Sequence, residues 1–162
     1  MEKMLLVLFA VLCVNLLPAI VSARFVGEPF VVKGYAYCDT CRCGYETDAT
    51  TYVAGATVRI ECRDRNTYQL TYTKEGETDS NGHYNILVES DRGDDPCDAV
   101  LVKSPDAECS TPNQGRDRAR AIVTRNNGLN SNIRHANAMG FLKTTPLANC
   151  PQILQKYQYT DE

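Results

Sequence analysis

The sequence has little of what enzymes ordinarily use. Its 162 residues contain no tryptophan and only two histidines, His83 and His135. It contains no Gly-x-Ser-x-Gly elbow, no His-Glu-x-x-His zinc pair and no glycine-rich phosphate loop. Each histidine is expected to be a solvated residue in a turn or loop. The alternative is a catalytic role, because histidine is the usual proton carrier near neutral pH. The sequence predicts a protein that is not an enzyme and that binds no cofactor or metal.

Strong charge and long apolar runs are also scarce. The formal net charge is −3, which argues against nucleic-acid binding because that requires many cations to neutralise phosphates. The one long apolar run, residues 5–17, is shorter than the roughly 20 residues of a membrane span. It precedes the small residues Val21, Ser22 and Ala23, which are typical of a signal-peptidase site. We therefore expect a signal peptide at 1–23, no membrane span, and a single domain at 24–162 that is secreted to the extracellular space or cell wall.

Cysteine is the abundant unusual residue, and CDTCRC places three cysteines within residues 38–43. Such spacing is compatible with a redox pair, a metal site or disulfides. No amphipathic helix follows the motif, as a redox pair would need, and the remaining cysteines lack paired metal-ligand spacing. Secretion favours disulfides, but their pairing stays open, and one cysteine must lack a partner within the chain. The seven cysteines beyond the signal peptide are Cys38, Cys41, Cys43, Cys62, Cys97, Cys109 and Cys150.

The rest of the sequence reads as short strands separated by turns. Residues 56–62 alternate, with Val58 and Ile60 on one side and Arg59 and Glu61 on the other, which is typical of a half-buried strand. The turn at 79–82 ends in Gly82, which is free to take a positive φ. Regularly spaced strands predict an all-β, seven-stranded antiparallel Greek-key sandwich or small barrel. The seven predicted strands cover residues 31–38, 56–62, 67–73, 83–89, 99–103, 118–125 and 139–143.

Two segments are candidates for partner binding. Arg116, Arg118, Arg120 and Arg125 form a local basic stripe, which either protects a sheet edge or docks an acidic partner. The asparagine-rich stretch 126–137 is the longest predicted loop.

The C-terminal segment offers a third candidate. Residues 152–162 are predicted to form a flexible tail that carries Tyr157 and Tyr159. These two tyrosines are candidates for oxidative cross-linking in a cell wall.

The stretch GYAYCDTCRCGYET, residues 34–47, resembles the signature of the pollen Ole e I-like family of plant pollen allergens and extensins. The resemblance continues through VAGATVRIEC (53–62), TDSNGHY (78–84) and the segment that ends in PLANC at Cys150. It implies a seven-stranded antiparallel β fold and leaves Cys43 as the odd thiol, available for a disulfide-linked dimer. The disulfides that it implies are Cys38–Cys109, Cys41–Cys150 and Cys62–Cys97.

The resemblance also implies a function. The family suggests a secreted, non-enzymatic plant protein that acts in pollen hydration, germination and pollen tube growth, with receptor-like kinase ectodomains or wall components as partners. One alternative is a structural wall protein bound or cross-linked to polysaccharide or extensin. A protease inhibitor is less favoured, because no reactive loop is identifiable in the sequence.

Overall fold

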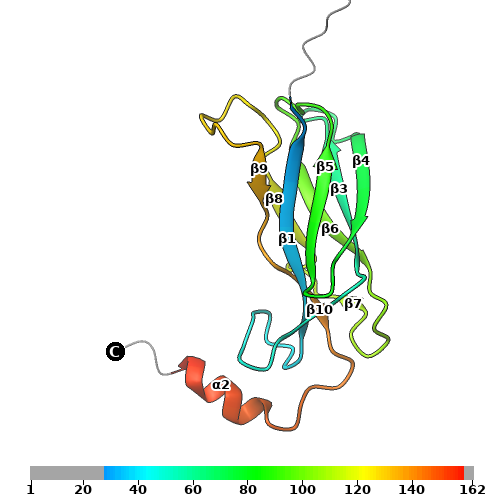
Figure 1. Cartoon of the computed structure of the whole chain (residues 1–162). Helices are drawn as coiled ribbons and strands as arrows, with labels where there is room; N and C mark the ends of the chain where they lie inside the picture. The colour runs from blue at the N-terminus through cyan, green and yellow to red at the C-terminus, as the bar shows by residue number, and fades with distance from the viewer. Residues whose placement is uncertain (1–27, 159–162) are drawn as a thin grey trace, which may run out of the picture.

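The computed structural model describes residues 28–158, so the expected signal peptide at 1–23 and Tyr159 lie outside the described residues. Within this range ten strands form two sheets, and one helix follows them (Figure 1). No helix in this part of the chain is long and apolar enough to cross a membrane. The elements are β1 (Phe30–Asp39), β2 (Thr51–Tyr52), β3 (Thr57–Arg63), β4 (Leu70–Glu77), β5 (His83–Val88), β6 (Cys97–Lys103), β7 (Thr111–Pro112), β8 (Arg118–Ala121), β9 (Ile133–His135), β10 (Met139–Leu142) and α2 (Cys150–Gln158).

The first sheet is built around β1, which changes neighbours halfway along its length. Its first half pairs antiparallel with β5 and parallel with β9, which runs beside Val31 to Lys33. Its second half, from Ala36 onward, pairs parallel with β10 and antiparallel with the short β2. The remaining strand, β7, pairs with β10. In Figure 1, β5, β1 and β9 lie side by side, with β3 and β6 behind them.

The second sheet has the order β4-β3-β6-β8, and each of its pairs is antiparallel. The alternation expected around residues 56–62 is present, because Val58 and Ile60 are fully buried while Arg59 is half-buried. In β8, Ala119 and Ala121 point inward and Arg118 and Arg120 point outward. Alternating inward residues of this sheet therefore meet those of the first sheet in one shared core.

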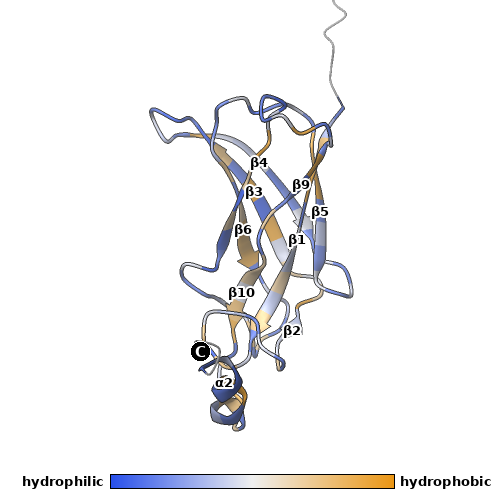
Figure 2. Ribbon diagram, turned by 90° about the vertical axis from the view of Figure 1, so that its left-hand side faces the viewer, coloured by the Kyte–Doolittle hydropathy of each residue, from blue (hydrophilic) through white to orange (hydrophobic). Residues whose placement is uncertain are grey.

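The core is a single cluster that takes large side chains from both sheets. Figure 2 shows apolar residues along the strands and mostly polar residues along the loops. Fully burying a large apolar side chain contributes roughly 1.5–3 kcal/mol, so these contacts hold the two sheets together. The largest fully buried members include Tyr84, Phe30, Phe141, Ile60 and Met139.

The structure is mostly β, as predicted, and has two sheets. The prediction of seven antiparallel strands in a Greek-key arrangement is corrected, because the described residues form ten strands and some of these pair parallel. Strands β9 and β10 pair parallel with β1, and β9 lies inside the stretch 126–137 that was expected to be a loop. A three-residue strand is too short to show a period-two pattern. The strand expected at 67–73 begins only at Leu70, because Tyr68 has φ 58° and the Asp64 carboxylate accepts hydrogen bonds from the turn before it.

Helix α2 corrects the prediction of a flexible tail beginning near residue 152, since residues up to Gln158 are helical. Pro151 occupies the first turn, where a missing N–H is tolerated. Cys150 links this turn to Cys41 through a disulfide. In Figure 1, α2 lies at the lower end of the molecule, whereas β9 and the start of β1 lie towards the upper end.

Tyr84 provides a test of the core. Tyr84 is 1% exposed, and its ring packs over Gly34, the residue opposite it on β1. Its hydroxyl has no hydrogen-bond partner among the described residues, and burial raises the pKa of Tyr84 above its ordinary value. Because an unpaired buried hydroxyl is unfavourable by about 1–3 kcal/mol, Tyr84→Phe should leave the free energy of unfolding unchanged or raise it by about 1 kcal/mol. Urea unfolding would measure this, and a loss above about 1 kcal/mol would show a hydrogen bond to buried water.

Candidate binding face

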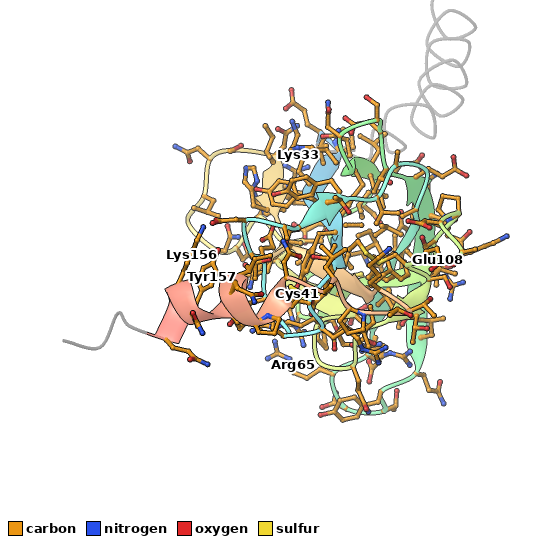
Figure 3. All side chains as sticks on the ribbon, turned by 90° about the horizontal axis from the view of Figure 1, so that it is seen from below. Lys33, Cys41, Arg65, Glu108, Lys156 and Tyr157 are labelled. Carbon is orange, nitrogen blue, oxygen red and sulfur yellow. A yellow bond between two sulfur atoms is a disulfide. The ribbon has the colours of Figure 1, made fainter. Side chains whose placement is uncertain are left out.

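Three disulfides hold the sheet ends in place, and their pairs coincide with those that the resemblance implies. Cys38–Cys109 and Cys62–Cys97 lie in the core, with each sulfur-bearing residue no more than 3% exposed. The third, Cys41–Cys150, connects the loop after β1 to the start of α2 (Figure 3). The cysteines of CDTCRC therefore join distant segments and do not pair with one another.

The loop that follows β1 is organised by one buried carboxylate. Asp39 is 1% exposed, and its oxygens accept hydrogen bonds from the backbone N–H groups of Cys43 at 3.1 Å and Gly44 at 2.7 Å. Arg42 has φ 54° and donates to the carbonyls of Lys143 and Thr144 at 3.3 and 3.2 Å. These contacts give Asp39 and Arg42 structural roles in the motif.

The outward face of strands β5, β1 and β9 gathers side chains that the sequence keeps far apart. On β1, Tyr35 lies directly opposite His83, and their rings meet edge-on with centroids 4.7 Å apart. Lys33 lies between Asn85 on one side and His135 on the other. From one end of this face to the other, the cross-strand rows are Leu87, Val31 and Ile133, then Asn85, Lys33 and His135, then His83 and Tyr35. We call this surface the β1 face.

A hollow of about 930 Å³ lies on the β1 face. It forms where β1 leaves β9 after Lys33 and has not yet met β10, which begins pairing at Ala36. The crossing segment 136–138 lines one side, and the turn at 79–82 contributes Asp79 and Asn81 to the other. Both histidines line the hollow, a convergence that sequence reasoning missed because it arises only through their shared neighbour β1.

The four arginines of the predicted basic stripe are divided by the fold. Arg118 and Arg120 are exposed on β8 and both form ion pairs with Asp98 of β6, at 3.6 and 3.0 Å. Arg116 lies exposed in the preceding turn, where its carbonyl accepts from Gly140 N–H. Arg125 instead lies over the Phe30 ring at 4.9 Å and donates to the Glu28 carbonyl. Arg118 and Arg120 thus share a counter-charge, and Arg125 is used to hold the start of β1.

Comparison with known proteins places this geometry in a family. A family model described as "Pollen protein Ole e 1 like" matches residues 28–158. The chain belongs to this family. It is 45% identical over 157 residues to Protein DOWNSTREAM OF FLC of Arabidopsis thaliana, a match that covers 97% of this chain and 94% of that protein.

Two pollen allergens extend the comparison. The chain is 43% identical over 136 residues to pollen allergen Phl p 11 of Phleum pratense, which covers 83% of this chain and 95% of the allergen. The crystal structure of the major plantain pollen allergen Pla l 1 resembles it with a TM-score of 0.67 at 27% identity, covering 76% of this chain and 100% of that one. The descriptions of the family model and of both allergens refer to pollen. Among the described residues, no three His, Cys, Asp or Glu side chains are grouped so as to hold a metal ion.

In this member of the Ole e 1-like family, α2 is tied to the loop before β2. Tyr157 donates to the Asp48 carboxylate at 3.1 Å and accepts from Asp48 N–H at 3.0 Å, while Lys156 forms a 2.7 Å ion pair with the same carboxylate (Figure 3). Hydrogen bonds from Lys156 and Tyr157 lower the pKa of Asp48. The Tyr157 ring also meets Tyr45 edge-on at 5.7 Å, and 38% of Tyr157 stays exposed.

Cys43 is the one cysteine of residues 28–158 without a disulfide. Its thiol donates to the Tyr45 carbonyl at 3.3 Å and lies 3.6 Å from an Asp39 carboxylate oxygen. Partial burial raises the pKa of the Cys43 thiol, and the negative charge of Asp39 raises it further, against a backbone hydrogen bond from Tyr45 that favours the thiolate and lowers the pKa.

Because the thiolate is the reactive form, Cys43 should react slowly at neutral pH. We expect the rate of alkylation by iodoacetamide to increase with pH in both states. The midpoint of this increase should lie at a higher pH in the folded, oxidised protein than in the same protein unfolded in urea. Mass spectrometry across pH 7–11 would measure both profiles. Superimposed profiles would contradict the role given to burial and Asp39. A disulfide-linked dimer through Cys43 stays a prediction, and the raised pKa implies that it forms slowly.

Proposed function

We propose that this protein is a secreted, non-enzymatic binding protein of pollen that acts in hydration, germination and tube growth by engaging a receptor-like kinase ectodomain or a wall component. The observation that supports it most is the β1 face, which presents aromatic and amide side chains around β1, a strand that the Cys38–Cys109 disulfide holds in place. Side chains already held by a rigid frame lose little freedom on binding, so such a face suits recognition.

The test separates the two kinds of partner. Oxidised mature protein would be incubated with salt-washed pollen tube walls and, separately, with solubilised pollen and pistil membranes, beside a reduced and alkylated control. We expect one fraction to retain the oxidised form alone, because the β1 face exists only in the folded protein. Retention by walls would identify a wall component, and retention of a receptor-like kinase ectodomain would identify a receptor. Equal retention of both forms, or of neither, would contradict the proposal.

The exposure of Tyr157 favours a second candidate, a structural wall protein held by tyrosine cross-links. Peroxidase with hydrogen peroxide oxidises two phenols to radicals that couple, and a 38% exposed phenol is accessible to this reaction. After such treatment on isolated walls, wild-type protein should resist extraction by hot detergent, and the double variant Tyr157→Phe, Tyr159→Phe should be released. Full release of the wild type would remove this candidate.

A further inference from the structure

The hollow on the β1 face has the composition of a site for a small polar ligand. Its volume of about 930 Å³ falls within the roughly 300–1,000 Å³ of known small-molecule sites. It is lined by side chains from β1, β5, β9, the crossing segment 136–138, the turn before β5 and the loop before β2. These elements are all part of the first sheet or are connected directly to it, so the hollow is a fixed feature of the fold.

Tyr35 and His83 supply exposed rings to the lining, and Tyr52 packs beside Tyr35 without lining the hollow itself. Tyr35 meets His83 at 4.7 Å and the neighbouring Tyr52 at 6.1 Å, both edge-on. Tyr35 is 38% exposed and Tyr52 50% exposed, and the Tyr52 hydroxyl donates to Glu46 at 2.9 Å. The rings are therefore held in place while their surfaces remain open. Exposed rings of this kind supply a rigid, partly apolar surface with a polar edge.

Amide side chains form the other part of the lining. Asn81, Asn85 and Asn137 are exposed, and within residues 28–158 none of their side-chain amides makes a hydrogen bond. Each amide offers two donors and an accepting oxygen. Asp79, in contrast, is occupied, because its carboxylate accepts from the N–H groups of Asn81 at 2.8 Å and His83 at 3.0 Å. The free groups are thus neutral and can both donate and accept.

The charges around the hollow decide which ligand class fits. Lys33 contributes one positive charge, while Glu46 and Asp79 contribute two negative charges. A polyuronate or a phosphate is negatively charged and would need an excess of positive charge in the site. The lining has no such excess. A ligand rich in hydroxyl groups but without charge matches the amides, and its C–H faces match the tyrosine rings.

We propose that the hollow binds a short segment of neutral polysaccharide, with its sugar rings against Tyr35 and its hydroxyls on Asn85 and Asn137. This inference rests on the part of the proposed function in which the partner is a wall component. It specifies that the component is a neutral glycan. The site lies on the first sheet, on the opposite side of the molecule from the β3–β4 turn that carries Arg65, as Lys33 and Arg65 show in Figure 3.

The two histidines make the site measurable, because both line the hollow and the chain has no others. Proton NMR of their ring signals would be followed during titration of the oxidised protein with neutral tetrasaccharides: cello-, xylo-, arabino- and galacto-tetraose. Trigalacturonate would serve as the acidic probe and a hydroxyproline-rich peptide as the peptide probe. We expect at least one neutral tetrasaccharide to shift both histidine signals in a saturable way, and more tightly than either other probe.

Matched variants test the assignment. Tyr35→Ala should weaken binding about tenfold, the value of one well-placed aromatic contact. Tyr68→Ala is the control, since Tyr68 is 70% exposed in the β3–β4 turn, away from the hollow, and its loss should leave binding unchanged. Circular dichroism would verify that both variants are folded.

Three results would overturn the proposal: no saturable shift with any neutral probe, tighter binding of trigalacturonate or the peptide, or equal affinity of Tyr35→Ala and wild type. Wall or receptor retention that persists alongside any of them would leave the proposed function standing without this site. Conversely, tetrasaccharide binding without retention by walls or receptors would keep the site and refute the function.

Discussion

Replacing Cys62 and Cys97 together by alanine should lower the free energy of unfolding by about 4 kcal/mol. The disulfide closes a loop with a sequence separation of 35, and in the chain-entropy model the loss of such a link gives the unfolded chain about this much additional freedom. Both residues lie in the core, at 0% and 1% exposure, and join β3 to β6. Urea unfolding of the oxidised variant and wild type, at the same pH, would measure the difference.

The matched control is Cys43→Ala, which removes a cysteine without removing a disulfide. Cys43 is only half-buried and its thiol contacts are weak, so its replacement should change stability by less than about 1 kcal/mol. A loss below about 1 kcal/mol in the double variant would contradict this prediction. It would show that the β3–β6 disulfide restricts the unfolded chain little and is dispensable for stability. Because folding is marginal, a 4 kcal/mol loss would also remove much of the rigidity of the β1 face.

Local patterns predicted those parts of the fold in which neighbours in sequence decide the outcome. Alternation placed Val58 and Ile60 inside and Arg118 and Arg120 outside, because a strand's side chains change sides at each residue. The turn before β5 was predicted from its residues alone, and Gly82 has φ 75° there. In each case the physical cause lies within a few residues of the feature.

Features that depend on distant partners could not be predicted in this way. Strands β9 and β10 are three and four residues long, and they exist because β1 offers hydrogen bonds roughly a hundred residues away along the chain. His83 and His135 looked unrelated because only β1 brings them to one hollow. Disulfide pairing required the family resemblance, since counting cysteines does not choose among pairings. Helix α2 was not predicted from the sequence. It has only nine residues, and its position depends on the disulfide from Cys150 to the distant Cys41.

Gly82→Ala should have the second large effect, a loss of about 2–5 kcal/mol in the free energy of unfolding. An alanine at φ 75° is strained by about 1–2 kcal/mol. Its Cβ would also lie 2.7 Å from Tyr52 Cβ and 2.8 Å from the Ala36 carbonyl oxygen, a collision with backbone that requires β2 to move away from β1. Overpacking of this kind destabilises by about 1–3 kcal/mol. Thermal and urea unfolding would measure the total.

Gly128→Ala separates strain from collision. Gly128 has nearly the same φ, 76°, but an added Cβ would meet nothing within 4 Å, so only the strain of about 1–2 kcal/mol should appear. Equal losses in the two variants would show that β2 yields freely and that the collision at Gly82 is harmless. A larger loss at Gly82 would show that β2 is rigidly seated. Since the Tyr52 ring meets Tyr35 at 6.1 Å, displacing β2 would then also disturb the aromatic side of the hollow, and Gly82→Ala should weaken tetrasaccharide binding while Gly128→Ala should not.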